Sequence, residues 1–401
     1  MPLPLETVTV LDFTQIMAGP MATRQLSLMG ATVIKVEPRG HGDVMRPMMA
    51  TGAAAEHGFS PLHQYLNPGK RSLALDLKTD AGVEIAQKLA TRADVIVENF
   101  RPGVMARFGL DAATVRRDNP SVVYCSISGY GREGPKAELA AYDGPLQADS
   151  GLMSVNGFPD GPPTRLGVMA IDMLVGANAA SAILGGLYRR KETGEGQVID
   201  ISMFETALHL LTPQVVSFTN EGAEMGRNGN NTAANLPTDN LFRTDDGDLL
   251  ITAINDGQIK TLFQVLGLDE MAGSAATATP EARRENADLI HEKVSLALAA
   301  DSAVEWEAKL REAGVPCARV RTVPEVLDDP QVGVNELLKE TDSFADLGIP
   351  AATVPAAGYR ADTDGPAIRP APLLSADAEE ILGELGYSGA EIEALRTEEV
   401  I

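Results

Sequence analysis

Residues 7–37 read TVTVLDFTQIMAGPMATRQLSLMGATVIKVE, and this stretch decides the fold class. An apolar run at 7–13 precedes a pattern with helical spacing at 21–29, and a second apolar run follows at 31–37. Short apolar runs that alternate with amphipathic stretches are typical of parallel strands joined by crossover helices. The stretch therefore predicts a strand, a helix and a strand of an α/β protein.

The same rhythm continues beyond this stretch. Further strands are predicted at 72–77, 94–100 and 121–127, and a helix capped by Thr79 is predicted at 79–93. Together these elements predict a doubly wound parallel, Rossmann-like domain, which continues with a long Ala- and Gly-rich helix from about Ala170, a strand at 198–202 and another apolar helix at 204–216.

The rest of the chain predicts a second, smaller unit. A polar, Gly- and Asn-rich segment precedes a strand at 246–254, and helical segments continue to about residue 329. The final residues predict two short acidic helices. We expect a large domain at 1–220 that is completed by 331–401, a linker at 221–239 and a small α/β domain at 240–330.

Composition excludes several classes of function. The chain has 401 residues and a formal net charge of −23, which disfavours binding to nucleic acid or to an anionic membrane. Its two cysteines are far apart and its five histidines lack the spacing of metal ligands, so neither disulfides nor a metal site is predicted. With no signal peptide and no run of about 18 apolar residues, we expect a cytoplasmic protein.

The common nucleotide and hydrolase motifs are missing. The sequence has no GxxxxGK[ST], HExxH or GxSxG pattern. The turn after the first predicted strand contains only Gly19, before Pro20, where a dinucleotide site needs GxGxxG. An NAD-dependent oxidoreductase is therefore kept only as a remote alternative.

Cationic residues gather at the predicted strand ends, where ligands bind in open α/β sheets. These residues are Arg39, Lys70, Arg71, Lys78, Arg101 and Arg107. In so acidic a chain, such a group indicates a small ligand that carries phosphates, although each residue by itself is compatible with a solvated loop charge.

Asp172 is the most informative lone carboxylate. It lies between Ile171 and Met173 at the start of an apolar helix, where an uncompensated charge is costly. Two roles are open from the residues alone, a helix N-cap and a catalytic carboxylate. Upstream, Tyr142 and Asp143 form either an ordinary turn or a pair that assists Asp172.

Eight segments, in this order, resemble the class III CoA-transferase family, which includes formyl-CoA and carnitine CoA-transferases and the related α-methylacyl-CoA racemases. They are LDFTQIMAGPMAT, GATVIKVEPRGHGDVMRP, GKRSLALDLKTDAG, ADVIVENFRPGVMARFGL, SISGYGREGP, LYRRKETGEGQVIDISMFE, GVPCARVRTVPEVLDDPQV and RPAPLLSADAEEILGELGYS.

The resemblance implies a CoA-transferase with acyl-CoA and a carboxylic acid as substrates, no permanently bound cofactor, and an interlocked homodimer. It places the nucleophile on Asp172, with Tyr142 and Asp143 beside it, and implies that the large domain binds CoA. The CoA-binding residues that it implies are Gln15, Ile16, Ala18, Arg39, Leu75, Lys78, Asn99, Phe100, Arg107 and Phe108.

Departures from the family pattern narrow the reaction. Met17 replaces the glutamine of the formyl-CoA enzymes, and Pro38 replaces an arginine of some relatives, which argues against oxalate and formate chemistry. Tyr142 stands where the racemases carry a histidine, and Asn255 lies near the position of a second racemase carboxylate, so transfer is favoured over racemization.

Two further alternatives stay open. A non-catalytic acyl-CoA binder would use the same CoA contacts without Asp172. The segment Gly226 to Asn235 is either a flexible element near the site or an ordinary linker.

Overall fold

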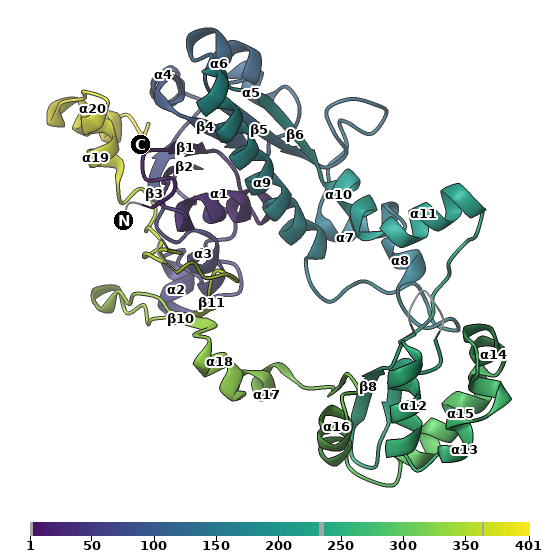
Figure 1. Cartoon of the computed structure of the whole chain (residues 1–401). Coiled ribbons are helices and arrows are strands. Elements are labelled where there is room, and N and C mark those ends of the chain that lie inside the picture. The colour runs from purple at the N-terminus through teal and green to yellow at the C-terminus, as the bar shows by residue number, and fades with distance from the viewer. Residues whose placement is uncertain (1–2, 232–235, 363–364) are drawn as a thin grey trace. The chain divides into compact units, whose positions relative to one another are not determined.

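The computed structural model describes residues 3–231, 236–362 and 365–401, and its internal contacts divide the chain into two units. The first unit comprises residues 1–150, 167–210 and 331–401, and the second comprises 151–166 and 211–330 (Figure 1). Of the segment Gly226 to Asn235, residues 232–235 lie outside the described part of the chain.

The first unit is built on a six-stranded parallel sheet in the order β3-β2-β1-β4-β5-β6. Its strands are β1 Thr9–Asp12, β2 Thr32–Pro38, β3 Arg71–Leu75, β4 Val95–Glu98, β5 Val123–Ser128 and β6 Val198–Ser202. This order reverses between β1 and β4, so the carboxyl ends of these two strands form the topological switch point of the sheet. The predicted α/β class is confirmed.

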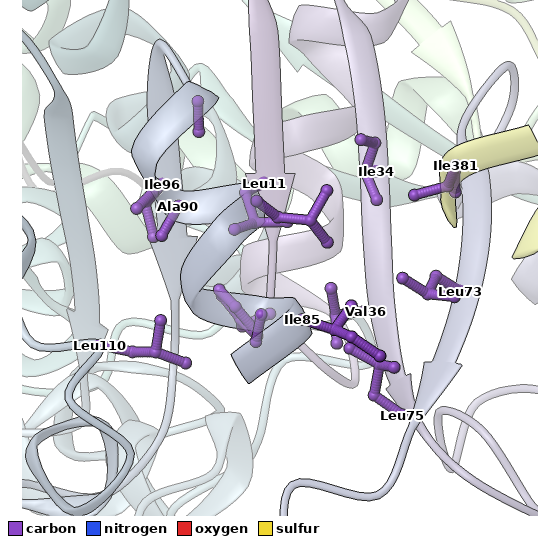
Figure 2. Packing of buried hydrophobic residues seen from close by; sticks show 14 of the residues in the cluster. Leu11, Ile34, Val36, Leu73, Leu75, Ile85, Ala90, Ile96, Leu110 and Ile381 are labelled. Carbon is purple, nitrogen blue, oxygen red and sulfur yellow. The ribbon is translucent and has the colours of Figure 1, made fainter. Parts of the chain in front are cut away.

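Both faces of the sheet are covered by helices, because successive residues of each strand point to opposite sides. Leu11, Ile34 and Leu73 point to the face that packs against α4 (Asp80–Arg92), α6 (Ala112–Asp118), α19 (Ala378–Glu384) and α20 (Gly389–Thr397) (Figure 2). Val10 and Val33 point to the other face, where α1 (Ala18–Leu28), α9 (Ala170–Thr193) and α10 (Met203–Leu210) pack. As predicted, the Thr79 side chain caps α4 by accepting the Gly82 N–H.

Helix α9 is a core helix of the first unit. Among the described residues it is the one helix long and apolar enough to cross a membrane, but half of its most apolar window is buried inside the protein. It packs against α1, and a Cβ on Gly176 would lie 2.6 Å from Cγ of Met21 and 3.1 Å from the Ala18 carbonyl oxygen. The small residues of α9 therefore allow two helices to approach closely.

The C-terminal segment of the chain completes the first unit. The residues just before its helix α19 are joined to β3 by bonds from the Ser72 N–H to Asp377 Oδ2 (2.8 Å) and from the Ser375 N–H to Ser72 Oγ (2.9 Å). A short antiparallel pair, β10 (Leu338–Glu340) and β11 (Thr353–Pro355), precedes it. The remaining helices of the first unit are α2 Gly52–Glu56, α3 Pro61–Leu66, α5 Val104–Arg107 and α7 Asp143–Asp149, with α18 Pro330–Val334 at its boundary.

The second unit has its own sheet and core. Its antiparallel strands are β7 Asp239–Arg243, β8 Asp248–Thr252 and β9 Cys317–Arg319, and its core includes Phe242, Phe263 and Trp306. Its helices are α8 Leu152–Val155, α11 Thr212–Glu221, α12 Asp256–Val265, α13 Asp269–Ala272, α14 Pro280–Glu285, α15 Ala287–Leu298, α16 Ala303–Glu312 and α17 Val323–Leu327.

Candidate active site

Asp172 lies in the first turn of α9 and lines a cavity of about 210 Å³ within the first unit. Only 8% of the residue is exposed. The N-cap position of α9 is Met169, so Asp172 is not the capping residue that the sequence left open. Among the described residues none donates a hydrogen bond to its carboxylate, and the side chain is therefore a buried charge without a partner.

Asp143 provides the cap that α9 lacks in its own sequence. Its Oδ2 accepts the N–H groups of Ile171 (2.9 Å) and Asp172 (3.2 Å), two of the free donors at a helix start. Gln147 Nε2 donates to Asp143 Oδ1 at 2.6 Å. Asp143 is 4% exposed and faces the backbone of α9, so it supports the helix start that carries Asp172 and does not itself line the cavity.

The environment of Asp172 changes its acidity. Burial, together with the negative charge of Asp143, raises the pKa of Asp172 from 3.8 to about 7. A strongly shifted carboxyl that lines a cavity is typical of functional sites.

The cavity collects most of the predicted site residues that follow β1 and β4. Asn99 Nδ2 donates to the Gln15 carbonyl oxygen (2.8 Å), and the Gln15 N–H donates to Asn99 Oδ1 (3.0 Å), so the two strand-end loops are joined at the switch point. Tyr142, which is 61% exposed, lies at the same cavity. The predicted residues that line it are Gln15, Ile16, Ala18, Asn99, Phe100, Tyr142 and Asp172.

Arg101, one of the cations predicted to lie at the strand ends, is in the cavity wall, and no described residue forms an ion pair with it. The remaining lining residues were not among the predicted site residues. Ser128 ends β5 and Gly129 follows it, so the rule that ligands bind at strand ends could have found them. The other lining residues that were missed are Met17, Pro102, Ile127, Ala137, Leu139, Ala140, Ala141 and Met203.

Five predicted CoA contacts lie outside this cavity. Leu75 is 2% exposed, and its side chain packs in the core. Arg39 forms an ion pair with Glu399 at 3.3 Å. Lys78 and Arg107 are exposed and, within the described part of the chain, form no ion pair. Phe108, the fifth residue away from the cavity, is half-buried against the core.

The predicted group of cations is smaller than expected. Lys70 is buried, and its Nζ lies 3.0 Å from Asp12 Oδ2. Burial, only partly offset by Asp12, lowers the pKa of Lys70 to about 8. Arg71 contacts Glu380 and Glu384. These two residues therefore stabilise the fold and do not form a phosphate site.

A dinucleotide site also needs an acidic residue near the end of the second strand to bind a ribose. Glu37, the acid near the end of β2, is 1% exposed and is held by Arg46 through bonds of 2.7 and 2.6 Å. Its carboxylate is therefore not free to bind a ribose.

The fold and the cavity define a class of protein, a Rossmann-like enzyme whose switch point holds a buried, unpaired carboxylate. The chain belongs to CoA-transferase family III, whose sequence profile matches residues 5–378. It is a transferase that moves CoA between an acyl-CoA and a carboxylic acid.

Relatives cover almost the whole chain. The acetyl-CoA:oxalate CoA-transferase of Acetobacter aceti is 35% identical over 92% of this chain and 93% of its own length. The succinate–glutarate CoA-transferase of Agrobacterium fabrum is 32% identical over 95% and 96%, respectively. The crystal structure of a CAIB/BAIF family protein from Brucella suis covers 96% of this chain and 100% of its own, with a TM-score of 0.82 and 30% identity. The predicted family is confirmed.

Proposed function

We propose that Asp172 is the nucleophile that carries the transferred groups. The observation behind this proposal is that its carboxylate is buried, unpaired among the described residues and placed in the cavity wall. Taking a carboxylate out of water without pairing it removes the solvation that makes it a weak nucleophile.

The proposed reaction has four balanced steps. Ionised Asp172 attacks the acyl carbonyl of the donor, and the C–S bond breaks to give a mixed anhydride and CoA thiolate. The thiolate attacks the Asp172 carbonyl, which releases the donor acid and leaves an aspartyl-CoA thioester. The acceptor carboxylate then forms a second anhydride and frees the thiolate again. Attack of the thiolate on the acceptor carbonyl yields the new acyl-CoA and restores Asp172.

No proton has to be transferred in this sequence. Among the described residues that line the cavity, the only titratable side chains are Asp172, Tyr142 and Arg101. A racemase needs an acid and a base on either side of the substrate carbon, and Asp143, the second carboxylate nearby, is engaged in capping α9. The site therefore favours transfer over the α-methylacyl-CoA racemase alternative.

Backbone donors supply the electrostatic part of the proposal. Helix α1 begins at Ala18, and its N-cap residue Met17 makes no side-chain cap. Both residues line the cavity of Asp172. The N–H groups and the positive end of the helix dipole at this terminus would stabilise the oxyanions of the tetrahedral intermediates. Tyr142 would contact the substrate from the exposed side, and Asp143 would orient α9 and keep the pKa of Asp172 high.

The size of the cavity supports the proposal that it takes the reacting end of the donor. About 210 Å³ is less than the roughly 300–1,000 Å³ of pockets that enclose a whole drug-sized ligand, so it would take the thioester and the acyl group. Gln15, Ile16, Ala18, Asn99 and Phe100 would contact the adjacent part of CoA. Of the outlying predicted contacts, Arg39, Lys78, Arg107 and Phe108 would serve its nucleotide end.

The acids named for the two relatives, oxalate, succinate and glutarate, are dicarboxylic. We propose a small dicarboxylic acid as the acceptor. The residue Met17 argued against oxalate, but a similar protein is named as an oxalate CoA-transferase, so oxalate stays among the proposed acceptors. We also propose that the protein is an interlocked homodimer in the cytoplasm. In this proposal the first unit binds CoA, and the second unit is a separate small domain.

The test is CoA exchange by the wild type and by Asp172→Ala and Asp172→Asn. Acetyl-CoA and succinyl-CoA are screened as donors against oxalate, succinate, glutarate and short branched acids. We expect exchange by the wild type and its loss in both variants, with circular dichroism unchanged. Exchange that survives in both variants would refute Asp172 as the nucleophile, whereas no exchange by the wild type with any donor and acceptor would favour the non-catalytic alternative.

A further inference from the structure

Ile16 has a backbone conformation that its side chain disfavours. Its φ is 72°, and it is the one β-branched residue at positive φ among the described residues. A β-branched residue in the left-handed region is a steric outlier, and such strain persists only where the surroundings enforce it. Ile16 lies in the loop between β1 and α1, in the wall of the cavity that contains Asp172.

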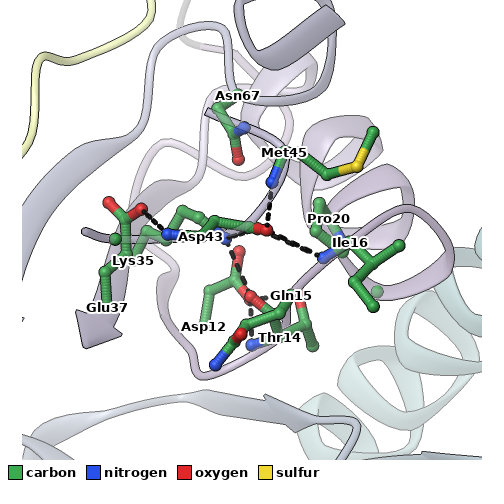
Figure 3. Close-up of polar contacts among 12 residues, drawn as sticks. Asp12, Thr14, Gln15, Ile16, Pro20, Lys35, Glu37, Asp43, Met45 and Asn67 are labelled. Atoms are coloured by element: carbon green, nitrogen blue, oxygen red, sulfur yellow. Dashed lines mark hydrogen bonds and ion pairs between the residues drawn. The ribbon is translucent and has the colours of Figure 1, made fainter. Parts of the chain in front are cut away.

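Asp43 is the group that holds this conformation. The Ile16 N–H donates to Asp43 Oδ1 at 3.1 Å and Oδ2 at 3.2 Å (Figure 3). The Met45 N–H donates to the same Oδ1, also at 3.1 Å. Asp43 is fully buried, so these bonds are shielded from competing water.

A buried set of charges fixes Asp43 in turn. Lys35 Nζ lies 3.0 Å from Asp43 Oδ2 and donates to the Thr14 carbonyl oxygen at 2.8 Å. Lys35 therefore binds the loop before Gln15, and Asp43 binds it after Gln15. Although burial alone would lower the pKa of Lys35, the charges of Asp43 and Asp12 raise it, and the lysine stays charged. The Asp43 N–H donates to Glu37 Oε1 at 3.0 Å.

The loop that follows Ile16 has little freedom to adjust elsewhere. A Cβ on Gly19 would lie 2.3 Å from Cβ of Thr14, so the chain folds back tightly on itself. Met17 and Ala18, the residues directly after Ile16, line the cavity. The conformation of Ile16 therefore determines where the start of α1 faces the cavity.

We propose that Asp43 is a positioning residue: through its bond to the Ile16 N–H it holds Ile16 in the left-handed conformation and so places the start of α1 against the reacting groups at Asp172. This inference rests on the proposed function of Asp172. A glycine at position 16 would take the same conformation without strain, but it would lose the apolar contacts of Ile16 with the cluster around Met17, Met21 and Met45. The bond from Asp43 allows the isoleucine to be kept.

The experiment uses three variants of the full chain: Asp43→Asn, and the same change combined with Ile16→Gly or Ile16→Ala. Gly and Ala remove the same contacts and differ in their tolerance of positive φ, so they form a matched pair. The readouts are the rate of Asp172 acylation in a single turnover, trapped with hydroxylamine, and the melting temperature.

We expect Asp43→Asn to slow acylation by about tenfold or more, and the Gly double variant to recover at least about threefold of that loss while the Ala double variant recovers none. A role of Asp43 in stability alone predicts a lower melting temperature and no difference between Gly and Ala in acylation. Equal acylation rates in the two double variants, or an unchanged rate in Asp43→Asn, would overturn the proposal.

If Asp43→Asn does not fold, Ile16→Pro tests the same bond. Proline has no N–H for Asp43 and cannot reach positive φ, while the pair of Lys35 and Asp43 stays intact. We expect acylation to fall by about tenfold or more, and a wild-type rate would contradict the proposal. Wild-type enzyme that exchanges CoA without any acylation of Asp172 would refute the proposed nucleophile instead, so the two failures are distinguishable.

Discussion

Replacing Asp172 by asparagine should abolish CoA exchange and at the same time stabilise the protein. The buried carboxylate is kept at a cost, which appears as the difference between its ordinary pKa of 3.8 and its folded pKa of about 7. At about 1.4 kcal/mol per pH unit, that difference corresponds to about 4 kcal/mol when the group is ionised. Asparagine has a similar shape and no charge, so it removes this cost.

The direction of the pH dependence follows from the raised pKa. Between pH 3.8 and 7 the folded protein holds a proton on Asp172 that the unfolded chain releases, so the wild type loses stability from this group as the pH rises through that window. The variant has no such loss. Its advantage in the free energy of unfolding should grow from about 2 kcal/mol at pH 5 to about 4 kcal/mol at pH 8.

Urea unfolding at pH 5, 6, 7 and 8, followed by circular dichroism, measures this difference. Asp118→Asn, at an exposed carboxylate in α6, is the matched control and should show no such trend. The reasoning is refuted if Asp172→Asn is no more stable than the wild type at pH 8, or if its advantage does not change with pH.

Three further predictions follow from the same geometry. The rate of Asp172 acylation should rise about tenfold between pH 6 and 8, with a midpoint near 7. Asp143→Asn should move this midpoint to lower pH, because the charge of Asp143 helps to raise the pKa of Asp172. A rate of acylation that does not depend on pH would contradict this prediction. Gly176→Ala should lower the free energy of unfolding by about 1–3 kcal/mol and slow exchange, because the added Cβ pushes α1 away from α9; Gly185→Ala, at an open position of α9, is the control for both measurements. Arg107→Gln should raise the KM for the acyl-CoA donor by about threefold to tenfold at unchanged kcat, whereas Arg396→Gln, whose side chain is paired with Glu379, should leave it unchanged.

The sheet was predictable because β1 to β5 are largely buried on both faces. These strands are short apolar runs, and helical spacing separates the first run from the second and the third from the fourth, so local patterns in the sequence carry the fold. Gln15 and Asn99, which the family resemblance implied as CoA contacts, lie at one cavity because the switch point brings the ends of β1 and β4 together.

The sequence predicted charge partners less well. Lys70 resembled a phosphate ligand, but it pairs with Asp12, which is 58 residues earlier in the chain. Asp143 resembled a second catalytic acid, but it caps a helix that starts 27 residues later. Both contacts depend on tertiary packing, and a residue type at a strand end does not distinguish a ligand contact from a buried ion pair or a cap.

The most direct test of the central claim is to locate the covalent intermediate. Enzyme is incubated with acyl-CoA and hydroxylamine, digested with trypsin, and analysed by mass spectrometry for the peptide that spans residues 166–189. A hydroxamate on Asp172 that forms only when acyl-CoA is present is the predicted result. CoA exchange that continues without any modification of Asp172, or a hydroxamate on Asp143 instead, would contradict the assignment of Asp172 as the nucleophile.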